Sequence, residues 1–266
     1  MSTDVKFEND SGFVLEKIKR AYDDKTRAGD VEMDFLRSHV YRYISFWMAV
    51  PFVRAGWTAD QTTWVRIVVG VAGLGLLMVG NYWVQVAGAW LMLLNVILDY
   101  VDGNVARVSG STFFGGFLDD IADILIKAVT PLCVAVGLYF RPDILLAGFE
   151  YDPMMILLVG VVITACSGAK AYVQAEHVRY QLLAEARKRE LNPEQEPEVY
   201  DTTLPPISIT YIYRTGVSAM HLLLPLCAMT QTLSIFLGLM VIARVVTFPI
   251  VLVQAVRDAH RNLHWD

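Results

Sequence analysis

The sequence is poor in charge: Asp, Glu, Lys and Arg make up 18% of its 266 residues, whereas soluble domains average about 25%. Together with a hydrophobic share of 55%, this shortage excludes an ordinary soluble globule. It also excludes a disordered chain, which needs low hydrophobicity. An excess of basic residues is missing as well, because the formal net charge is −5, and no nucleic-acid partner is expected.

Cysteine is scarce, and its positions exclude two further classes of protein. Cys133, Cys166 and Cys227 all lie inside apolar runs, which is the pattern of neither a disulfide framework nor a zinc site. The first 30 residues are polar and charged, so no signal peptide is expected. What the chain does contain is long apolar runs, which are typical of a helical membrane protein.

Six apolar stretches are candidates for membrane spans, each of which needs about 20 mostly apolar residues. We expect them at residues 62–79, 82–98, 113–140, 154–173, 209–229 and 232–256. The second helix should continue toward Arg107, and Thr58 or Asp60 should cap the first. The predicted fold class is all-α: a polytopic membrane protein with six transmembrane helices.

The basic residues are distributed unevenly between the predicted loops. Segment 1–61 holds nine Lys and Arg residues, whereas connections 80–81 and 230–231 hold none. Because basic loops stay in the cytoplasm, both termini and the second–third and fourth–fifth connections are expected there. The short loops favour a multi-pass protein of a prokaryotic plasma (inner) membrane.

The region before the first span divides in two. Residues 1–32 are mixed in charge and are assigned to a polar N-terminal tail, and residues 33–266 to a membrane-embedded domain. After the tail, apolar residues recur at helical spacing: Leu36, Val40, Ile44, Trp47 and Met48. This stripe predicts an amphipathic helix on the cytoplasmic membrane surface. A helix packed against the bundle is the alternative. Residues 187–206 are expected to form a solvated loop.

The most informative stretch places carboxylates at the expected cytoplasmic ends of the second and third spans. Steps of three and four place one set on a single helical face: Asp99, Asp102, Gly103, Ala106 and Arg107. On the next helix, a second face carries Asp119, Asp123 and Lys127, with Asp120 turned about 100° away. Charged groups at membrane depth are costly and usually mark function.

Two helices that each offer a pair of carboxylates predict a shared cation site. All-oxygen ligation favours Mg²⁺, Mn²⁺ or Ca²⁺ over zinc or copper. Arg107 adds a positive charge suited to phosphate, while Gly103 and Gly115 leave room beside the helices. The pattern therefore indicates a two-metal phosphoryl-transfer site. The alternative is that the acids only pair with Arg66, Arg107 and Lys127 inside the bundle.

This stretch resembles the signature of the CDP-alcohol phosphotransferase (CDP-alcohol phosphatidyltransferase) family, D-x2-D-G-x2-A-R-x8-G-x3-D-x3-D. The fixed positions correspond to Asp99, Asp102, Gly103, Ala106, Arg107, Gly115, Asp119 and Asp123. Seven residues, 108–114, precede Gly115, where the family usually has eight. Choosing Gly116 restores eight but puts Asp120 and Ile124 at the acid positions, which loses one acid.

The resemblance implies a membrane enzyme of phospholipid synthesis. It would move a substituted phosphate group, phosphatidyl in the leading hypothesis, from a CDP-linked donor such as CDP-diacylglycerol to an alcohol, releasing CMP. Two Mg²⁺ or Mn²⁺ ions would be held by Asp99, Asp102, Asp119 and Asp123. Asp123 would also be the general base. Donor contacts would come from Asp102, Gly103, Ala106, Arg107 and Gly115.

Lys127 and Arg244 are the candidates for binding the acceptor, because both are basic residues inside predicted spans. Lys127 could instead only balance the acids, and the sequence does not identify the acceptor alcohol. Membrane lipids are expected partners, and the resemblance suggests a homodimer. Two other functions stay open: a divalent-cation transporter that uses the same acids, and a non-catalytic member of the family. Arg107 argues against the transporter, because a cation path gains nothing from it.

Overall fold

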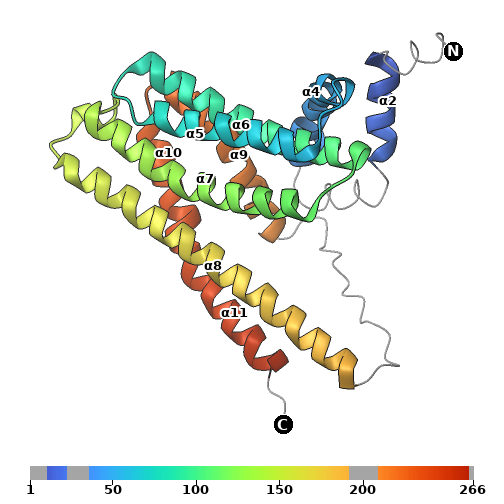
Figure 1. Cartoon of the computed structure of the whole chain (residues 1–266). Helices are drawn as coiled ribbons and strands as arrows, with labels where there is room; N and C mark the ends of the chain where they lie inside the picture. Colours follow the sequence, from blue (N-terminus) through green and yellow to red (C-terminus); the bar gives the residue numbers. More distant parts are fainter. Residues whose placement is uncertain (1–10, 23–35, 192–208, 264–266) are drawn as a thin grey trace.

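The computed structural model describes residues 11–22, 36–191 and 209–263, which form helices joined by turns and short loops and contain no strand (Figure 1). The elements are, in chain order, α2 (Ser11–Ala21), η1 (Arg37–Tyr41), α4 (Arg42–Arg54), α5 (Ala59–Leu77), α6 (Tyr82–Ser109), α7 (Phe113–Phe140), η2 (Leu146–Gly148), α8 (Pro153–Leu191), α9 (Ile209–Met229), α10 (Leu233–Met240), η3 (Val241–Val246) and α11 (Thr247–Leu263). The all-α class is confirmed for these ranges.

Four helices are long and apolar enough to cross a membrane. They are Tyr82–Ser109, Phe113–Phe140, Pro153–Tyr180 and Leu233–Arg257, and they coincide with four of the predicted spans. The predicted spans 62–79 and 209–229 correspond to helices α5 and α9. In α9 the apolar part, Ser218–Met229, is shorter than a span. The count of six spans therefore stays a prediction.

Side chains at the helix starts explain where the long helices begin. The Thr58 hydroxyl accepts from the backbone N–H of Gln61 at 3.3 Å, and the Gln61 side chain accepts from Thr58 N–H at 3.0 Å. This reciprocal capping satisfies two otherwise unpaired donors and decides for Thr58 over Asp60. Asn81 caps α6 by a single hydrogen bond, because its side chain accepts from Val84 N–H at 3.3 Å.

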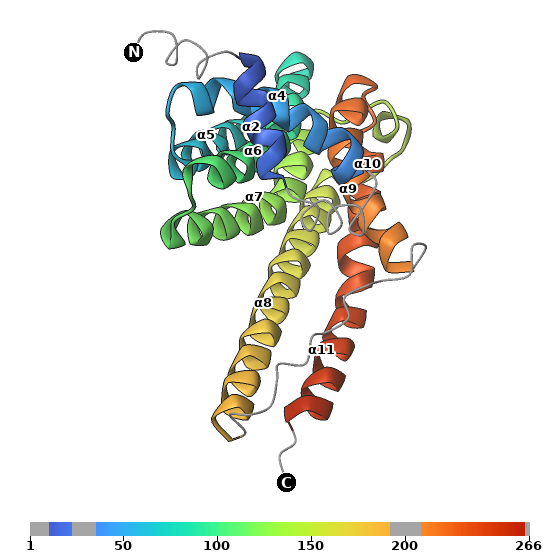
Figure 2. The same ribbon diagram turned by 90° about the vertical axis from the view of Figure 1, so that its right-hand side faces the viewer.

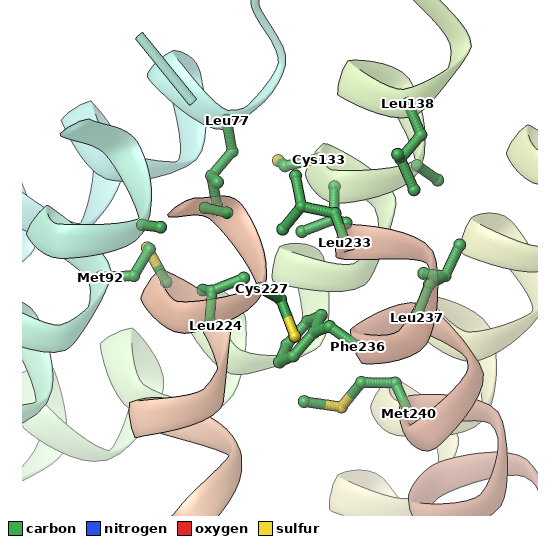
Figure 3. Packing of buried hydrophobic residues seen from close by; sticks show 14 of the residues in the cluster. Leu77, Met92, Cys133, Leu138, Leu224, Cys227, Leu233, Phe236, Leu237 and Met240 are labelled. Carbon is green, nitrogen blue, oxygen red and sulfur yellow. The ribbon is translucent and has the colours of Figure 1, made fainter. Parts of the chain in front are cut away.

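The main core lies where α5, α6 and α7 meet α8, α9 and α10. Figure 3 shows its packing, which includes Leu77, Met92, Leu138, Phe236 and Met240. Two of the three cysteines, Cys133 and Cys227, are buried in this core as unpaired thiols. Inside a bilayer such packing is favoured by close van der Waals contact, because lipid tails are as apolar as the side chains.

Helices α8 and α11 run side by side away from the layer of α5, α6 and α7 (Figures 1 and 2). The first half of α8 exposes large apolar side chains, among them Met155, Leu158 and Val161, as lipid-facing helices do. The predicted loop 187–206 begins too early, because α8 continues to Leu191. The rest of that predicted loop, 192–206, lies outside the described residues.

The N-terminal region contains a helix that the sequence analysis did not predict. Residues 11–21, assigned there to the polar tail, form α2, whose Val14, Leu15 and Ile18 are buried against the second half of α6. The division of the chain at residue 33 stays a prediction.

Helix α4 occupies the predicted amphipathic segment, but its buried face differs from the predicted apolar stripe. Arg42, Phe46 and Ala49 are buried in the bundle, whereas Ile44 and Trp47 are exposed. One face thus agrees with the alternative of a helix packed on the bundle. A place for the outer face on the membrane surface stays a prediction.

Candidate metal and phosphate site

The turn between α6 and α7 is short and sharply defined. It consists of residues 110–112 only, because the helices on either side contain residues 108–109 and 113–114. Gly110 ends α6 with φ +92°, a conformation that glycine adopts without a steric penalty, and its N–H donates to Ala106 O at 2.9 Å. The seven-residue spacing is thus accommodated within a three-residue turn.

Thr112 fixes the start of α7 against α5. Its hydroxyl oxygen accepts from Gly115 N–H at 2.8 Å and donates to the carboxylate of Asp60, with oxygen–oxygen distances of 2.8 and 3.0 Å. A Cβ on Gly115 would lie 2.0 Å from Asp60 Oδ1, whereas a Cβ on Gly116 would meet nothing within 4 Å. Gly115 is therefore the glycine that the packing requires, and it lies against Asp60.

Three of the predicted metal ligands meet between α6 and α7. Asp99, Asp102 and Asp119 each offer a carboxylate oxygen, and these oxygens all lie within 4.8 Å of one another. Asp123, the fourth predicted ligand, is not part of this group and lies one turn further along α7. Asp120 is exposed, which agrees with its predicted position on another face.

A buried arginine of α5 enters the carboxylate group. Arg66, whose side chain is 1% exposed, contacts Asp99, lies 2.7 Å from Asp119 Oδ1 and is 3.9 Å from Asp102 Oδ2 through Nη1. Its Nη2 also donates to the backbone carbonyl of Asp119 at 3.1 Å. The structure thus agrees in part with the alternative in which the acids pair with basic residues, because Arg66 pairs with them. One guanidinium against three carboxylates still leaves the group negatively charged.

The carboxylate group fits a hard divalent cation. Asp119 Oδ1 is buried and its partner in the described residues is the ion-paired Arg66 Nη1, and a carboxylate oxygen has more than one lone pair, so it can also contact a cation. The donors are all oxygen, which suits Mg²⁺ or Mn²⁺.

Asp123 and Lys127 connect the carboxylate group to a neighbouring pocket. Lys127 Nζ lies 2.6 Å from Asp123 Oδ2, and each side chain is about one-third exposed. Lys127 also lines a small pocket together with Asn95, His221 and Arg244. Arg244 Nε is buried there without a hydrogen-bond partner in the described part of the chain.

The two candidate acceptor residues therefore line one pocket, although they are far apart in the sequence. Arg244 lies in the π-helical segment η3, and such segments occur frequently at functional sites. The sequence analysis missed His221, because a lone histidine in an apolar run usually packs. Its Nδ1 lies 3.3 Å from the backbone oxygen of Ser218. Only the three-dimensional arrangement identifies it as a pocket residue.

The predicted donor-binding residues lie at the end of α6 that leads into the turn. Arg107 is exposed, Gly103 and Ala106 are half-buried, and Arg107 Nη1 donates to the side-chain oxygen of Asn104 at 3.2 Å. A Cβ on Gly103 would lie 3.5 Å from Arg107 Nη1. Gly103 therefore lies directly beneath this guanidinium.

Comparison with known proteins agrees with this geometry. Residues 57–260 match the family described as CDP-alcohol phosphatidyltransferase, a range that includes the carboxylate group and the pocket. The chain is also 40% identical over 78 residues to the inner membrane protein YnjF of Escherichia coli (strain K12), a match that covers 29% of this chain and 36% of that relative. The chain therefore spans about a third of the length of this curated relative. It belongs to the CDP-alcohol phosphatidyltransferase family.

Proposed function

We propose that this protein is a membrane transferase that moves a phosphatidyl group from a CDP-linked donor such as CDP-diacylglycerol to an alcohol, and releases CMP. One observation carries the proposal. In a chain of this family, Asp99, Asp102 and Asp119 offer carboxylate oxygens within 4.8 Å of one another. A lipid-linked donor also explains why such a group is built into apolar helices, since the donor itself lies in the membrane.

The residues of α6 and α7 divide the binding of the donor between them. Asp99, Asp102, Asp119 and Asp123 would hold two Mg²⁺ or Mn²⁺ ions, which when bound would neutralise charge on the transferred phosphate and on CMP. Arg107 would bind the diphosphate through its guanidinium. The remaining donor residues of the signature, Gly103, Ala106 and Gly115, would border the nucleotide.

Asp123 would act as the general base. The acceptor oxygen forms a new bond to the lipid-bearing phosphorus, the diphosphate P–O bond breaks, and CMP leaves with the bonding electron pair. The acceptor proton moves to the Asp123 carboxylate, which must therefore be unprotonated and within reach of the hydroxyl. Its contact with Lys127 at 2.6 Å competes with the acceptor for the carboxylate.

The pocket beside Asp123 supports an acceptor that carries a negative group. Lys127 and Arg244 both line this pocket, and a buried guanidinium nitrogen without a partner is costly unless a ligand binds it. An anionic group that attracts Lys127 would also release Asp123 for proton transfer. We therefore expect acceptors with a phosphate or carboxylate to react faster than neutral alcohols.

The same proposal includes the position in the membrane. We expect six spans, with α5 and α9 completing the four apolar helices, and the carboxylate group on the cytoplasmic side. The supporting observation is the distribution of Lys and Arg, with nine in segment 1–61 and none in connections 80–81 and 230–231. Cysteine labelling of single-cysteine variants from each side of the membrane tests this orientation.

The decisive experiment measures CMP release by the purified protein in detergent. CDP-diacylglycerol is supplied with neutral and anionic alcohols, in Mg²⁺, in Mn²⁺ or in EDTA. We expect metal-dependent CMP release that is lost in Asp123→Asn and retained in Asp120→Asn, a matched control at an exposed acid of the same helix. Lys127→Met should raise KM for anionic acceptors and leave neutral ones unchanged.

Three results would contradict the proposal. Metal flux into vesicles without nucleotide dependence would favour the divalent-cation transporter. Binding of Mg²⁺ without CMP release for any donor and acceptor would favour the non-catalytic family member. Equal loss of CMP release in Asp120→Asn and Asp123→Asn would contradict the assignment of Asp123 as the base.

A further inference from the structure

The N-terminal helices lie outside the matched family range, yet they contact the end of α6 that carries Arg107. The match begins at residue 57, whereas α2 and α4 end at Ala21 and Arg54. Both pack on α6 through a common apolar cluster that includes Ile18 of α2, Ala49 of α4 and Val105 of α6. The N-terminal helices therefore pack against the end of α6 that carries Arg107.

Asn104 joins α4 to the Arg107 guanidinium. Its side chain is buried, with 1% exposed, and its oxygen accepts from Arg107 Nη1 at 3.2 Å and from Arg42 Nη1 at 3.4 Å. Its amide nitrogen donates to the Ser45 hydroxyl at 2.9 Å. Asn104 occupies a variable position of the signature, between Gly103 and Ala106. The contact with α4 is thus made by a residue that the family pattern does not fix.

An aromatic ring of the N-terminal region faces both arginines. The ring centroid of Tyr22, directly after α2, lies 5.0 Å from Arg42 Cζ and 5.8 Å from Arg107 Cζ. The ring of Tyr100 in α6 also lies near Arg42, with its centroid 5.1 Å from Arg42 Cζ. These distances are within the range of cation–π attraction, about 6 Å. Tyr22 therefore helps to hold two like charges next to each other.

A guanidinium group held at a fixed position, as Arg107 is here, suits a diphosphate. Each guanidinium offers several N–H donors in a planar fork that matches phosphate oxygens. A guanidinium that is already oriented loses less conformational entropy when the ligand binds. Arg42 itself is 3% exposed, so its effect reaches the ligand through Asn104 and Arg107.

We propose that Tyr22, Arg42 and Asn104 are positioning residues that hold the Arg107 guanidinium ready for the diphosphate of the donor. The N-terminal helices are then a working part of the donor site in this chain. This inference rests on the proposed function, in which Arg107 binds the diphosphate.

The test compares kinetic constants of the full-length protein in detergent with CDP-diacylglycerol as the donor. We expect Tyr22→Leu to raise donor KM about threefold to tenfold, the effect of losing the cation–π contacts that hold Arg42 and Arg107, with kcat and acceptor KM unchanged. Tyr22→Phe keeps the ring and should behave as wild type. Tyr43→Leu is the matched control, because Tyr43 is 61% exposed on α4. Direct binding of CDP in Mg²⁺ should weaken in parallel with the change in donor KM.

A second set of variants separates this inference from the proposed function. In an Arg107→Lys background, which lacks the guanidinium fork, Tyr22→Leu and Asn104→Ala should have no further effect on donor KM. If Arg107→Lys alone leaves CDP binding unchanged, the donor assignment in the proposed function is wrong. If Arg107→Lys weakens CDP binding but Tyr22→Leu and Asn104→Ala do not, only the present inference fails. Equal losses in donor KM, acceptor KM and thermal stability would show a purely structural role for Tyr22 and overturn it.

Discussion

The carboxylates at the two ends of α7 differ in how fully they are paired. Beyond its C-terminal end, Asp143 is 5% exposed, and each of its oxygens accepts a backbone N–H, from Leu146 at 3.0 Å and from Ser234 at 2.7 Å. Near its N-terminal end, Asp119 and two acids of α6 share the single guanidinium of Arg66. Both oxygens of Asp143 are hydrogen-bonded, and the bond from Ser234 holds the start of α10 in place. The other group is left with excess negative charge, which suits a site that binds cations.

The largest effect should come from removing one charge from the carboxylate group near the N-terminal end of α7. Asp102→Asn is expected to lower the rate of CMP release about a thousandfold, because a preorganised charge is lost from the reacting centre. The melting temperature of the metal-free protein should stay the same or rise, since one repelling charge is gone. CMP assays and thermal unfolding in EDTA check both effects. A variant with activity within tenfold of wild type would contradict the site.

The second largest effect should come from removing the cation that the three acids share. Arg66→Met should cost about 3 kcal/mol of stability without metal, because it leaves the buried Asp102 and the partly exposed Asp99 and Asp119 without their shared cation. Added Mg²⁺ should restore more stability in this variant than in wild type. Thermal unfolding in EDTA and in Mg²⁺ measures this, with Arg179→Met as a control at an arginine whose side chain is 68% exposed. Equal gains from Mg²⁺ in both proteins would argue against a shared cation site.

Removing Asp143, beyond the C-terminal end of α7, should lower stability without changing activity. Asp143→Ala leaves two backbone N–H groups without their acceptor and is expected to cost about 2 kcal/mol, with unchanged CMP release per folded molecule. Asp152→Ala is the control, because Asp152 accepts from Met154 N–H at 2.9 Å at an exposed site and its loss should cost about 1 kcal/mol or less. Chemical denaturation in detergent compares the two. A kinetic defect in folded Asp143→Ala would remove the contrast between the ends.

The smallest effect concerns the turn that brings the acids together. Gly115→Ala would push Asp60 away and should cost about 1–2 kcal/mol, with a severalfold loss of activity as α7 shifts. Gly116→Ala has open space and should stay near wild type. Unfolding and CMP assays on this pair decide which of the two glycines the signature requires. The opposite order of effects would transfer that role to Gly116.

Periodicity in the sequence was sufficient for the long helices and for bringing together three of the four predicted metal ligands. Residues 113–140 were predicted as a span with the bounds that α7 has, and the steps of three and four placed Asp99, Asp102 and Asp119 correctly on inward faces. Thr58 was one of two predicted caps, and local hydrogen bonds decide for it. These features depend on neighbours within one or two helical turns, so the sequence contains them.

What the sequence could not supply depends on contacts between distant segments. Helix α2 is polar overall, and the sequence alone does not show that its three apolar side chains are buried against α6. The place of Arg66 among the acids, and of His221 beside Lys127, follows from how α5 and α9 pack. The separation of Asp123 from the other acids has the same origin, since equal spacing along a helix does not fix the distance to a second helix.

Helix α8 is too long to lie within a bilayer. Its 39 residues make it about 58 Å long, whereas the hydrocarbon layer is about 30 Å thick. To fit inside, it would have to tilt by about 60°, beyond the range of about 0–40° for membrane helices. Part of α8 must therefore stand in water as a rod, braced by α11. Helix α11 continues directly from the segment that carries Arg244, and both pack along α8, so the part of the protein in water is continuous with one wall of the pocket.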